Sequence, residues 1–173
     1  MRETRRAVIL KGKPVALVGP EIKAGQKAPD FKLLATDWSE VSLSRSAGKV
    51  RLLSAVYSLD TGICDLQTQR FEQEAAGLQG VIFYAISMGL PFAQARYCGA
   101  HNIKNLRTLS DYRDASFGRA YGVLIEETRL LSRAIFIIDR DDTVRYVEYV
   151  PEVGRHPQYD RAVEVLRQVI AQS

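Results

Sequence analysis

The chain has 173 residues, of which 46% are hydrophobic and 25% charged, and its formal net charge is +4. These values are typical of a globular protein with a sizeable core, and they exclude a wholly disordered chain. No apolar run approaches the roughly 20 residues that a membrane span requires, so no membrane partner is expected. The basic N-terminus is followed only by the short apolar run Ala7–Leu10, too short for a signal peptide, which favours a cytoplasmic protein.

Charge and ligand-type residues exclude further function classes. The basic residues are dispersed, apart from Arg2, Arg5 and Arg6, which are expected to lie in a solvated N-terminal arm. No basic stripe alternates with aromatic residues, so no nucleic-acid partner is expected. The two cysteines and two histidines lack zinc-site spacing, and no glycine-rich phosphate loop follows a strand. The sequence therefore predicts no metal and no cofactor.

The first half of the chain begins with strands. Ala7–Leu10 and Pro14–Val18 flank Lys11-Gly12-Lys13, which predicts a β-hairpin. Phe31–Ala35 is a short strand candidate, and Val50–Val56 is an apolar strand. Cys64–Leu78 then has apolar residues near helical spacing and is predicted to be a helix.

The second half alternates strands with helices and ends in a helix. The predicted strands are Val81–Met88, Arg107–Leu109, Ala134–Ile138 and Thr143–Val150, the last two joined by the turn Asp139–Asp142. The predicted helices are a short one from Pro91 toward Cys98, one over Ala115–Tyr121 stopped by Gly122, and an amphipathic one over Tyr159–Gln172.

This order of elements predicts an α/β fold with a mixed central sheet flanked by helices on both faces. On pattern alone, a thioredoxin-like and a flavodoxin-like sandwich both fit. The length favours a single domain over 1–173, in which 1–18 form the N-terminal arm and hairpin.

Cys64 is the first residue whose position suggests chemistry. It falls at the start of a predicted helix that follows a buried strand. Unpaired amide groups and the helix dipole at such a position stabilise a thiolate, although Asp65 next to it would oppose this. The alternative, a buried structural cysteine at a strand–helix junction, fits the same pattern equally well.

The residues around both cysteines resemble a known family. The segment Ser58-Leu59-Asp60-Thr61-Gly62-Ile63-Cys64 resembles the P-x-x-x-T-x-x-C motif of peroxiredoxins, and more narrowly that of the bacterial thiol peroxidases. Leu90-Pro91-Phe92-Ala93-Gln94-Ala95-Arg96-Tyr97-Cys98 is similar to the resolving-cysteine segment of that family, and the two cysteines are 34 positions apart. Similarity extends through Ser110–Asp114, Ala120–Val123 and Arg133–Asp139 to the last helix.

The resemblance implies a role for four residues. Cys64 matches the peroxidatic cysteine that attacks a peroxide, and Cys98 matches the cysteine that resolves the resulting sulfenic acid as an intramolecular disulfide. Thr61 matches the threonine whose hydroxyl bonds the thiolate and the peroxide, and Arg133 matches the arginine that holds both. The implied fold is thioredoxin-like with an N-terminal β-hairpin. Peroxide is the implied substrate, thioredoxin the implied electron donor and a homodimer the implied assembly.

The segment after Pro91 is expected to open during the reaction. Cys98 is placed near the end of its helix, and Gly99 is expected to permit that end. A disulfide requires the two Cα atoms to lie within about 7 Å, so one of the two cysteine segments is predicted to unwind. Arg96 is expected to be solvated.

Two positions depart from the family pattern and leave the function open. Tyr57 stands where the motif has proline, and Gly89 stands where the family usually has an acidic residue. Tyr57 is large enough to fill the substrate pocket, and its hydroxyl could act as a donor. A peroxidase-impaired redox-sensing or binding protein of the same fold is therefore the second hypothesis. An unrelated α/β domain with two structural cysteines is the third.

Overall fold

The computed structural model describes residues 6–172. Its strands are β1 (Ala7–Leu10), β2 (Lys13–Val18), β3 (Lys32–Leu34), β4 (Glu40–Ser42), β5 (Val50–Ala55), β6 (Val81–Ser87), β7 (Arg107–Ser110), β8 (Leu124–Ile125), β9 (Ala134–Ile138) and β10 (Val144–Tyr149). Its helices are the 3₁₀ helix η1 (Leu43–Ser46) and the α-helices α1 (Gly62–Gly77), α2 (Pro91–His101), α3 (Ser116–Ala120) and α4 (Tyr159–Ala171).

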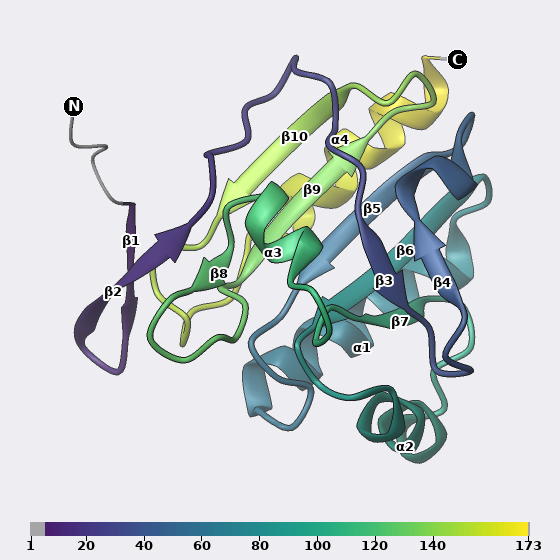
Figure 1. The fold of residues 1–173 in the computed structure, drawn as a ribbon. Coiled ribbons are helices and arrows are strands. Elements are labelled where there is room, and N and C mark those ends of the chain that lie inside the picture. Colours follow the sequence, from purple (N-terminus) through teal and green to yellow (C-terminus); the bar gives the residue numbers. More distant parts are fainter. Residues whose placement is uncertain (1–5, 173) are drawn as a thin grey trace.

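Most strands of the described chain join one mixed sheet in the order β10-β9-β5-β6-β7-β3-β4 (Figure 1). β5, β6 and β7 run parallel, whereas β9 and β3 pair antiparallel with β5 and β7. The parallel pairs form because α1 and α2 serve as crossover connections between consecutive strands. The predicted mixed α/β sheet is confirmed.

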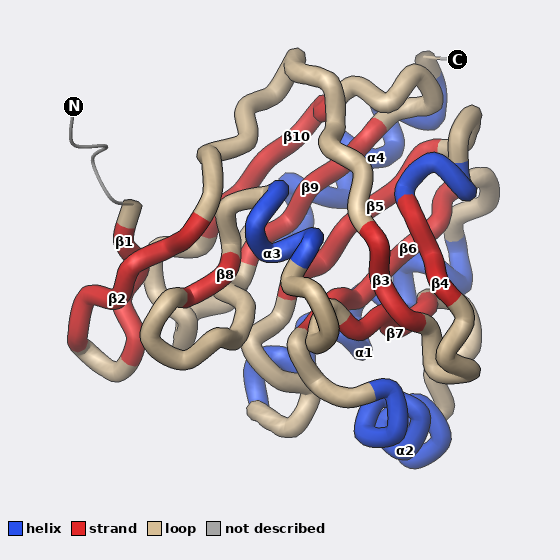
Figure 2. The backbone as a smooth tube through the Cα atoms, in the orientation of Figure 1, coloured by secondary structure: helices blue, strands red, loops and turns tan. Residues whose placement is uncertain are grey.

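Helices cover both faces of this sheet. α1 and α4 lie behind it and α3 lies in front (Figure 2). The cluster behind the sheet includes Leu52, Phe71, Phe83, Ile135 and Leu166 from both helices and the central strands. Because β5, β6 and β9 are covered on both faces, their sequences are continuous apolar runs rather than alternating ones.

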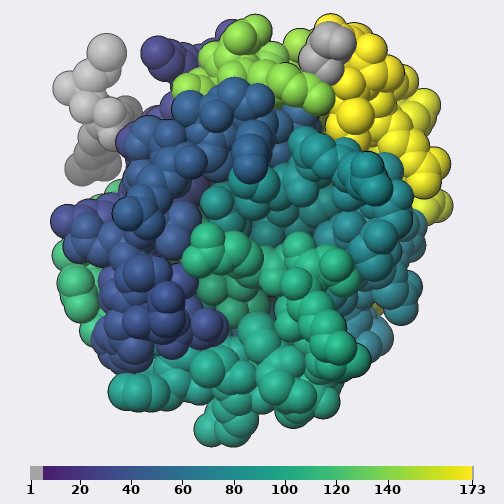
Figure 3. Space-filling model, turned by 90° about the vertical axis from the view of Figure 1, so that its right-hand side faces the viewer, coloured from purple at the N-terminus to yellow at the C-terminus, as the bar shows by residue number. Residues whose placement is uncertain are grey.

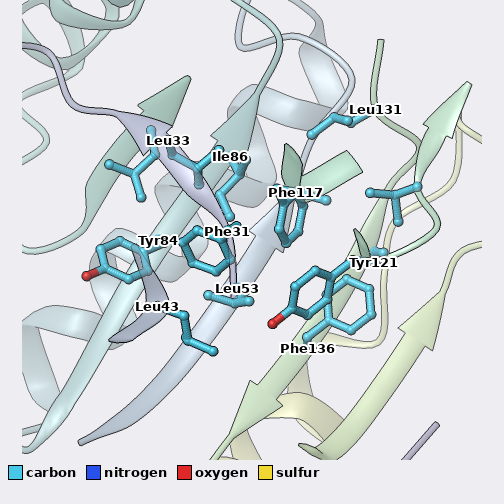
Figure 4. Packing of buried hydrophobic residues seen from close by; sticks show 14 of the residues in the cluster. Phe31, Leu33, Leu43, Leu53, Tyr84, Ile86, Phe117, Tyr121, Leu131 and Phe136 are labelled. Carbon is cyan, nitrogen blue, oxygen red and sulfur yellow. The ribbon is translucent and has the colours of Figure 1, made fainter. Parts of the chain in front are cut away.

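The front face is packed by aromatic rings. Phe117 and Tyr121 stack with ring centroids 4.7 Å apart, and both lie edge-on to Phe136 of β9. Phe31 meets Phe117 edge-to-face at 5.8 Å (Figure 4). The predicted stop after α3 is confirmed, because Gly122 has φ +67° and an added Cβ would lie 2.1 Å from the Pro20 carbonyl oxygen.

The predicted N-terminal hairpin is also confirmed, with a tighter turn than expected. Lys11 and Gly12 both have positive φ, of 51° and 79°, so the turn has two residues and Lys13 already belongs to β2. β2 continues the pairing onto β8, which makes a second, three-stranded sheet, β1-β2-β8.

Three elements were not predicted, namely β4, η1 and β8. Each has four residues or fewer, which is too short for a periodic hydrophobic pattern. The position of β8 is set by a neighbour distant in sequence, because Leu17 and Val18 of β2 pair with it, whereas β4 pairs with the adjacent strand β3.

The predicted end of α2 near Gly99 is wrong. The helix continues to His101, and Asn102 ends it in the left-handed conformation with φ 57°. The Asn102 and Ile103 amides both donate to the Cys98 carbonyl oxygen. Asparagine tolerates this conformation and so replaces glycine as the helix terminator.

The expected solvated arm is only partly testable. Arg2 and Arg5 lie outside the described residues. For Arg6 the expectation is wrong, since Arg6 Nη1 donates to the Gly122 carbonyl at 2.9 Å and its guanidinium lies 4.3 Å from the Tyr149 ring centroid. Within residues 6–172, no helix is both long enough and apolar enough to cross a bilayer.

Candidate active site

Cys64 is the third residue of α1 and is completely buried. The chain leaves β5 at Ala55, turns through 56–61 and enters α1 after Thr61, whose backbone is extended with φ −94° and ψ 148°. The turn is closed by the Thr61 amide, which donates to the Ser58 carbonyl at 3.1 Å. The predicted position of Cys64 at a helix N-terminus after a buried strand is confirmed.

The Cys64 sulfur faces a backbone donor. The Ser58 amide points at Cys64 Sγ over 3.5 Å. Apolar side chains of Val56, Leu59 and Tyr97 surround the sulfur in one cluster. The Ser58 amide and the N-terminus of α1 direct partial positive charge at the sulfur, and the apolar cluster keeps water away from it. The Ser58 amide was not identified from sequence, because a main-chain donor leaves no residue-type signal.

Thr61 lies in the same turn but is exposed. Its hydroxyl donates to the Ser58 carbonyl at 2.9 Å. In this arrangement the hydroxyl helps to shape the turn that presents the Ser58 amide to Cys64. A direct bond from Thr61 to the thiolate or the peroxide stays a prediction.

Arg133 immediately precedes β9 and is only 2% exposed. Its Nη1 donates to Gln67 Oε1 at 2.8 Å, and its Nε and Nη2 both donate to the Val153 carbonyl, at 3.2 and 2.7 Å. Gln67 is buried one turn after Cys64 on α1, and its Nε2 donates to Ser54 Oγ of β5 at 2.7 Å. The guanidinium is therefore fixed from two sides, next to the first turns of α1.

Gln67 was not identified from sequence, although a signal exists. It follows Cys64 by three positions, so both side chains leave the helix on the same buried face. Tyr159 of α4 interacts electrostatically with the same region. Burial raises the pKa of Tyr159, the positive charges of Arg133 and Arg70 oppose this rise, and Cys64 adds to it.

Cys98 is half-buried on α2 and packs against the cluster that contains Cys64. Its Sγ lies 3.3 Å from Thr108 Oγ1 of β7. Burial raises the pKa of the Cys98 thiol, a hydrogen bond with Thr108 lowers it, and the charge of Glu72 raises it again. Both cysteines are free, without a disulfide between them.

The carboxylate next to Cys64 is held by donors from two helices. Asp65 accepts hydrogen bonds from Tyr97 at 2.6 Å and Gln69 at 2.8 Å, and His101 Nδ1 lies 3.7 Å away. Burial by itself would raise the pKa of Asp65, but these bonds and the charge of His101 lower it overall. The lowered pKa keeps the negative charge on Asp65, so its expected opposition to a thiolate persists, while Tyr97 and His101 fix the carboxylate against α2.

The two departures from the family pattern occupy different surroundings. Tyr57 is half-buried and packs against both the Cys64 cluster and a second cluster formed by Val8, Leu17, Ile125 and Val153. Gly89 accepts a hydrogen bond from Ser110 Oγ and donates to Ser87 Oγ at 3.3 Å. Arg96 is exposed, as expected.

Residues 6–172 contain no group of three or more His, Cys, Asp or Glu side chains placed to hold a metal ion.

Comparisons with known proteins identify the family of this chain. The family profile described as Redoxin matches residues 23–163. A thiol peroxidase of Halalkalibacterium halodurans is 53% identical over 161 residues, covering 93% of this chain and 97% of that protein. One of Bacillus subtilis is 50% identical over 163 residues, covering 94% and 98%.

Solved structures give the same result. A peroxiredoxin-like protein from Aquifex aeolicus has a TM-score of 0.90 at 41% identity, covering 95% of this chain and 97% of that one. A thiol peroxidase from Chromobacterium violaceum has a TM-score of 0.85 at 22% identity, covering 96% and 98%, which shows the shared fold. With its thioredoxin-like sheet, its N-terminal hairpin and relatives of about half-identical sequence along nearly its whole length, the chain belongs to the Redoxin family and, within it, to the bacterial thiol peroxidases.

Proposed function

We propose that this chain reduces hydrogen peroxide or an alkyl hydroperoxide with Cys64 as the nucleophile and Cys98 as the resolving thiol. The observation that carries the proposal is the buried Cys64 sulfur at the start of α1, opposite the Ser58 amide at 3.5 Å. The proposal also takes residues 1–173 as one thioredoxin-like domain in the cytoplasm. Relatives named thiol peroxidase, about 50% identical to this chain, do not favour the peroxidase-impaired alternative.

In the first step the Cys64 thiolate attacks one oxygen of the peroxide. An S–O bond forms, the O–O bond breaks, and the sulfur becomes a sulfenic acid while the peroxide is reduced. The second oxygen leaves as an alkoxide or hydroxide and takes a proton from water. The helix N-terminus and the Ser58 amide are proposed to stabilise the thiolate before attack. Thr61 is proposed to turn its hydroxyl hydrogen from the Ser58 carbonyl to the peroxide when the peroxide binds.

Arg133 is proposed to stabilise the leaving oxygen. A guanidinium has five N–H groups, and three of these are committed to Gln67 and Val153. The remaining two are available for the peroxide and the leaving oxygen. Removing one such fixed donor commonly costs about 10²–10³ in rate, so loss of the Arg133 guanidinium should slow the peroxide step by a similar factor.

In the second step Cys98 resolves the sulfenic acid. The Cys98 sulfur attacks the Cys64 sulfur, the S–O bond breaks, and water leaves as the disulfide forms. The proton of the Cys98 thiol leaves with this water. A dithiol reductant of the thioredoxin type then reduces the disulfide by exchange and becomes oxidised itself.

A homodimer is proposed from an exposed aromatic patch. Trp38, Leu90 and Phe92 are 37%, 47% and 69% exposed, and the Trp38 and Phe92 ring centroids are 5.0 Å apart. Figure 3 looks onto this side, where the segment of Trp38 lies against the start of α2. A monomeric mass in solution would remove the proposal, and Phe92→Glu should convert a dimer to monomers.

The function is tested by one turnover without a reductant. Reduced protein is mixed with one equivalent of hydrogen peroxide, and free thiols and intact mass are followed over seconds. We expect both thiols to disappear and the mass to fall by two hydrogens. Cys64→Ser should abolish the reaction, whereas Cys98→Ser should stop it at a sulfenic acid that dimedone traps. Retention of both thiols for minutes would contradict the proposal.

A further inference from the structure

The N-terminal hairpin is linked to Arg133 through a single carbonyl group. Two of the three hydrogen bonds of the Arg133 side chain go to the Val153 carbonyl. Its position therefore depends on where the main chain at Val153 lies. Gln67 fixes only the opposite side of the guanidinium.

Val153 lies outside the regular strands, in the loop between β10 and α4. At its start the loop is tied to the residue before β9, because the Val150 amide donates to the Arg133 carbonyl at 3.0 Å. Further along it is tied to β1. The Ile9 amide donates to the Pro151 carbonyl at 2.9 Å, and the Val153 amide donates to the Ile9 carbonyl at 2.9 Å.

The register of the hairpin explains why Ile9 can hold the loop. Ile9 lies opposite Pro14, which has no N–H, so this pair makes no hydrogen bond inside the hairpin. Both main-chain groups of Ile9 therefore point away from β2 and toward 151–153. The result is a parallel bridge between Ile9 and Glu152 on the outer edge of β1.

Side-chain packing reinforces this link. Val153 is 5% exposed and packs with Val8, Leu17 and Ile125, which come from β1, β2 and β8. On its far edge β2 pairs with β8, so the hairpin is anchored to the body of the molecule there. The hairpin is thus fixed between β8 and the loop that carries Val153.

We infer that the N-terminal hairpin is a positioning element for Arg133, acting from Ile9 through the main chain of 151–153 and the Val153 carbonyl. The inference rests on the proposed role of Arg133 in peroxide reduction. Displacements of about 1 Å at a catalytic group can cost about 10²-fold in rate, so a loosened hairpin slows the first step without touching the sulfur.

The test removes one link at a time. Ile9→Pro deletes the amide that holds Pro151. Ala7→Pro is the matched control, because Ala7 also occupies a non-hydrogen-bonded pair and no described residue accepts a bond from its amide. Ile9→Val keeps both main-chain bonds. For each folded variant, the second-order rate of Cys64 oxidation by hydrogen peroxide is measured, together with the melting temperature.

Each substitution is then combined with Arg133→Met, whose side chain cannot donate a hydrogen bond to the Val153 carbonyl. We expect Ile9→Pro to lower the rate about tenfold when Arg133 is present and less than twofold with Arg133→Met. Ala7→Pro and Ile9→Val should stay within twofold of the parent. If Ile9→Pro does not fold, Val8→Ala loosens the same hairpin and should show the same dependence on Arg133.

An unchanged rate in a folded Ile9→Pro protein, or an equal loss in both backgrounds, would overturn the inference. Failure of the proposed role of Arg133 would give a different result. In that case Arg133→Met by itself would leave the rate of Cys64 oxidation unchanged.

Discussion

Tyr97 donates its hydroxyl hydrogen to Asp65 Oδ1 over 2.6 Å, and this bond joins the residue before Cys98 to the residue after Cys64. The bond ties α2 to the first turn of α1. The Tyr97 ring also stacks on His101, with centroids 4.3 Å apart. If either helix unwinds to bring the two sulfurs together, this bond must break.

Tyr97→Phe should therefore accelerate disulfide formation. The variant keeps the buried ring but removes a hydrogen bond to a carboxylate, which is worth about 1.5–3 kcal/mol. We expect the conversion of sulfenic acid to disulfide to become about tenfold faster, with no change in the peroxide step. Rapid-mixing kinetics that separate the two phases provide the measurement.

Gln69→Ala is the control for this variant. Gln69 also bonds Asp65, but within α1, so its loss should not change the resolving rate. An unchanged or slower resolving phase in Tyr97→Phe would show that the bond between the helices does not restrain the opening.

Disulfide formation should change amide-hydrogen exchange locally. Cys64 and Cys98 are both inside helices, and the Ile103 amide donates a hydrogen bond to the Cys98 carbonyl. Oxidation is expected to remove protection from 91–101 or from the first turn of α1, while 159–171 in α4 keep theirs. Equal protection of both cysteine segments in the two redox states would contradict the predicted unwinding.

Arg133→Lys should lower the rate of peroxide reduction about 100-fold. Lysine keeps the positive charge, but its single ammonium group cannot replace the planar set of guanidinium donors that binds Gln67, Val153 and a peroxide at the same time. Arg51→Lys is a matched control, because Arg51 is equally buried but bonds Asp142 and the Asp139 carbonyl instead. Stopped-flow measurement of Cys64 oxidation compares the two. A similar loss in both folded variants would argue against a specific role for Arg133.

Tyr57→Phe tests whether the tyrosine hydroxyl takes part in catalysis. No described residue hydrogen-bonds this hydroxyl, whereas the ring packs against two clusters. We therefore expect the peroxide rate to stay within twofold and the melting temperature to stay nearly constant. Tyr57→Ala should lower the melting temperature, because it empties that space. A tenfold slower Tyr57→Phe would instead identify the hydroxyl as a donor to peroxide.

Asp111 should make stability depend on pH in the direction opposite to most carboxylates. Burial raises the pKa of Asp111 to about 6 from 3.8, although the Gly118 and Phe117 amides donate to it. The folded state therefore binds the proton more tightly than the unfolded state. This stabilisation is fully present below about pH 4 and is lost as pH rises through 6.

The comparison that isolates this effect uses Asp111→Asn, which does not titrate. The free energy of unfolding of the parent minus that of the variant should fall by up to about 3 kcal/mol between pH 4 and pH 7. Urea unfolding at several pH values measures it. A difference that is constant or rises with pH would contradict the raised pKa.

The sequence by itself determined the elements whose residues carry a local pattern. The central strands are continuous apolar runs and α4 is amphipathic. Two short apolar runs on either side of Lys11 and Gly12 indicate the hairpin. The place of Cys64 at a helix N-terminus after a buried strand was equally readable, because it depends only on neighbours along the chain. The thiol peroxidase resemblance followed from the segments around both cysteines.

Only the tertiary structure decided which groups surround the sulfur and the guanidinium. The Ser58 amide and the Val153 carbonyl are main-chain groups, and their partners follow from how the chain turns rather than from residue type. β8 and the end of α2 were likewise set by pairing and capping. The contacts of Val153 and β8 join residues distant along the chain, which folding brings within hydrogen-bonding distance. Those of Ser58 and Asn102 are local, but they depend on main-chain geometry that residue type does not encode.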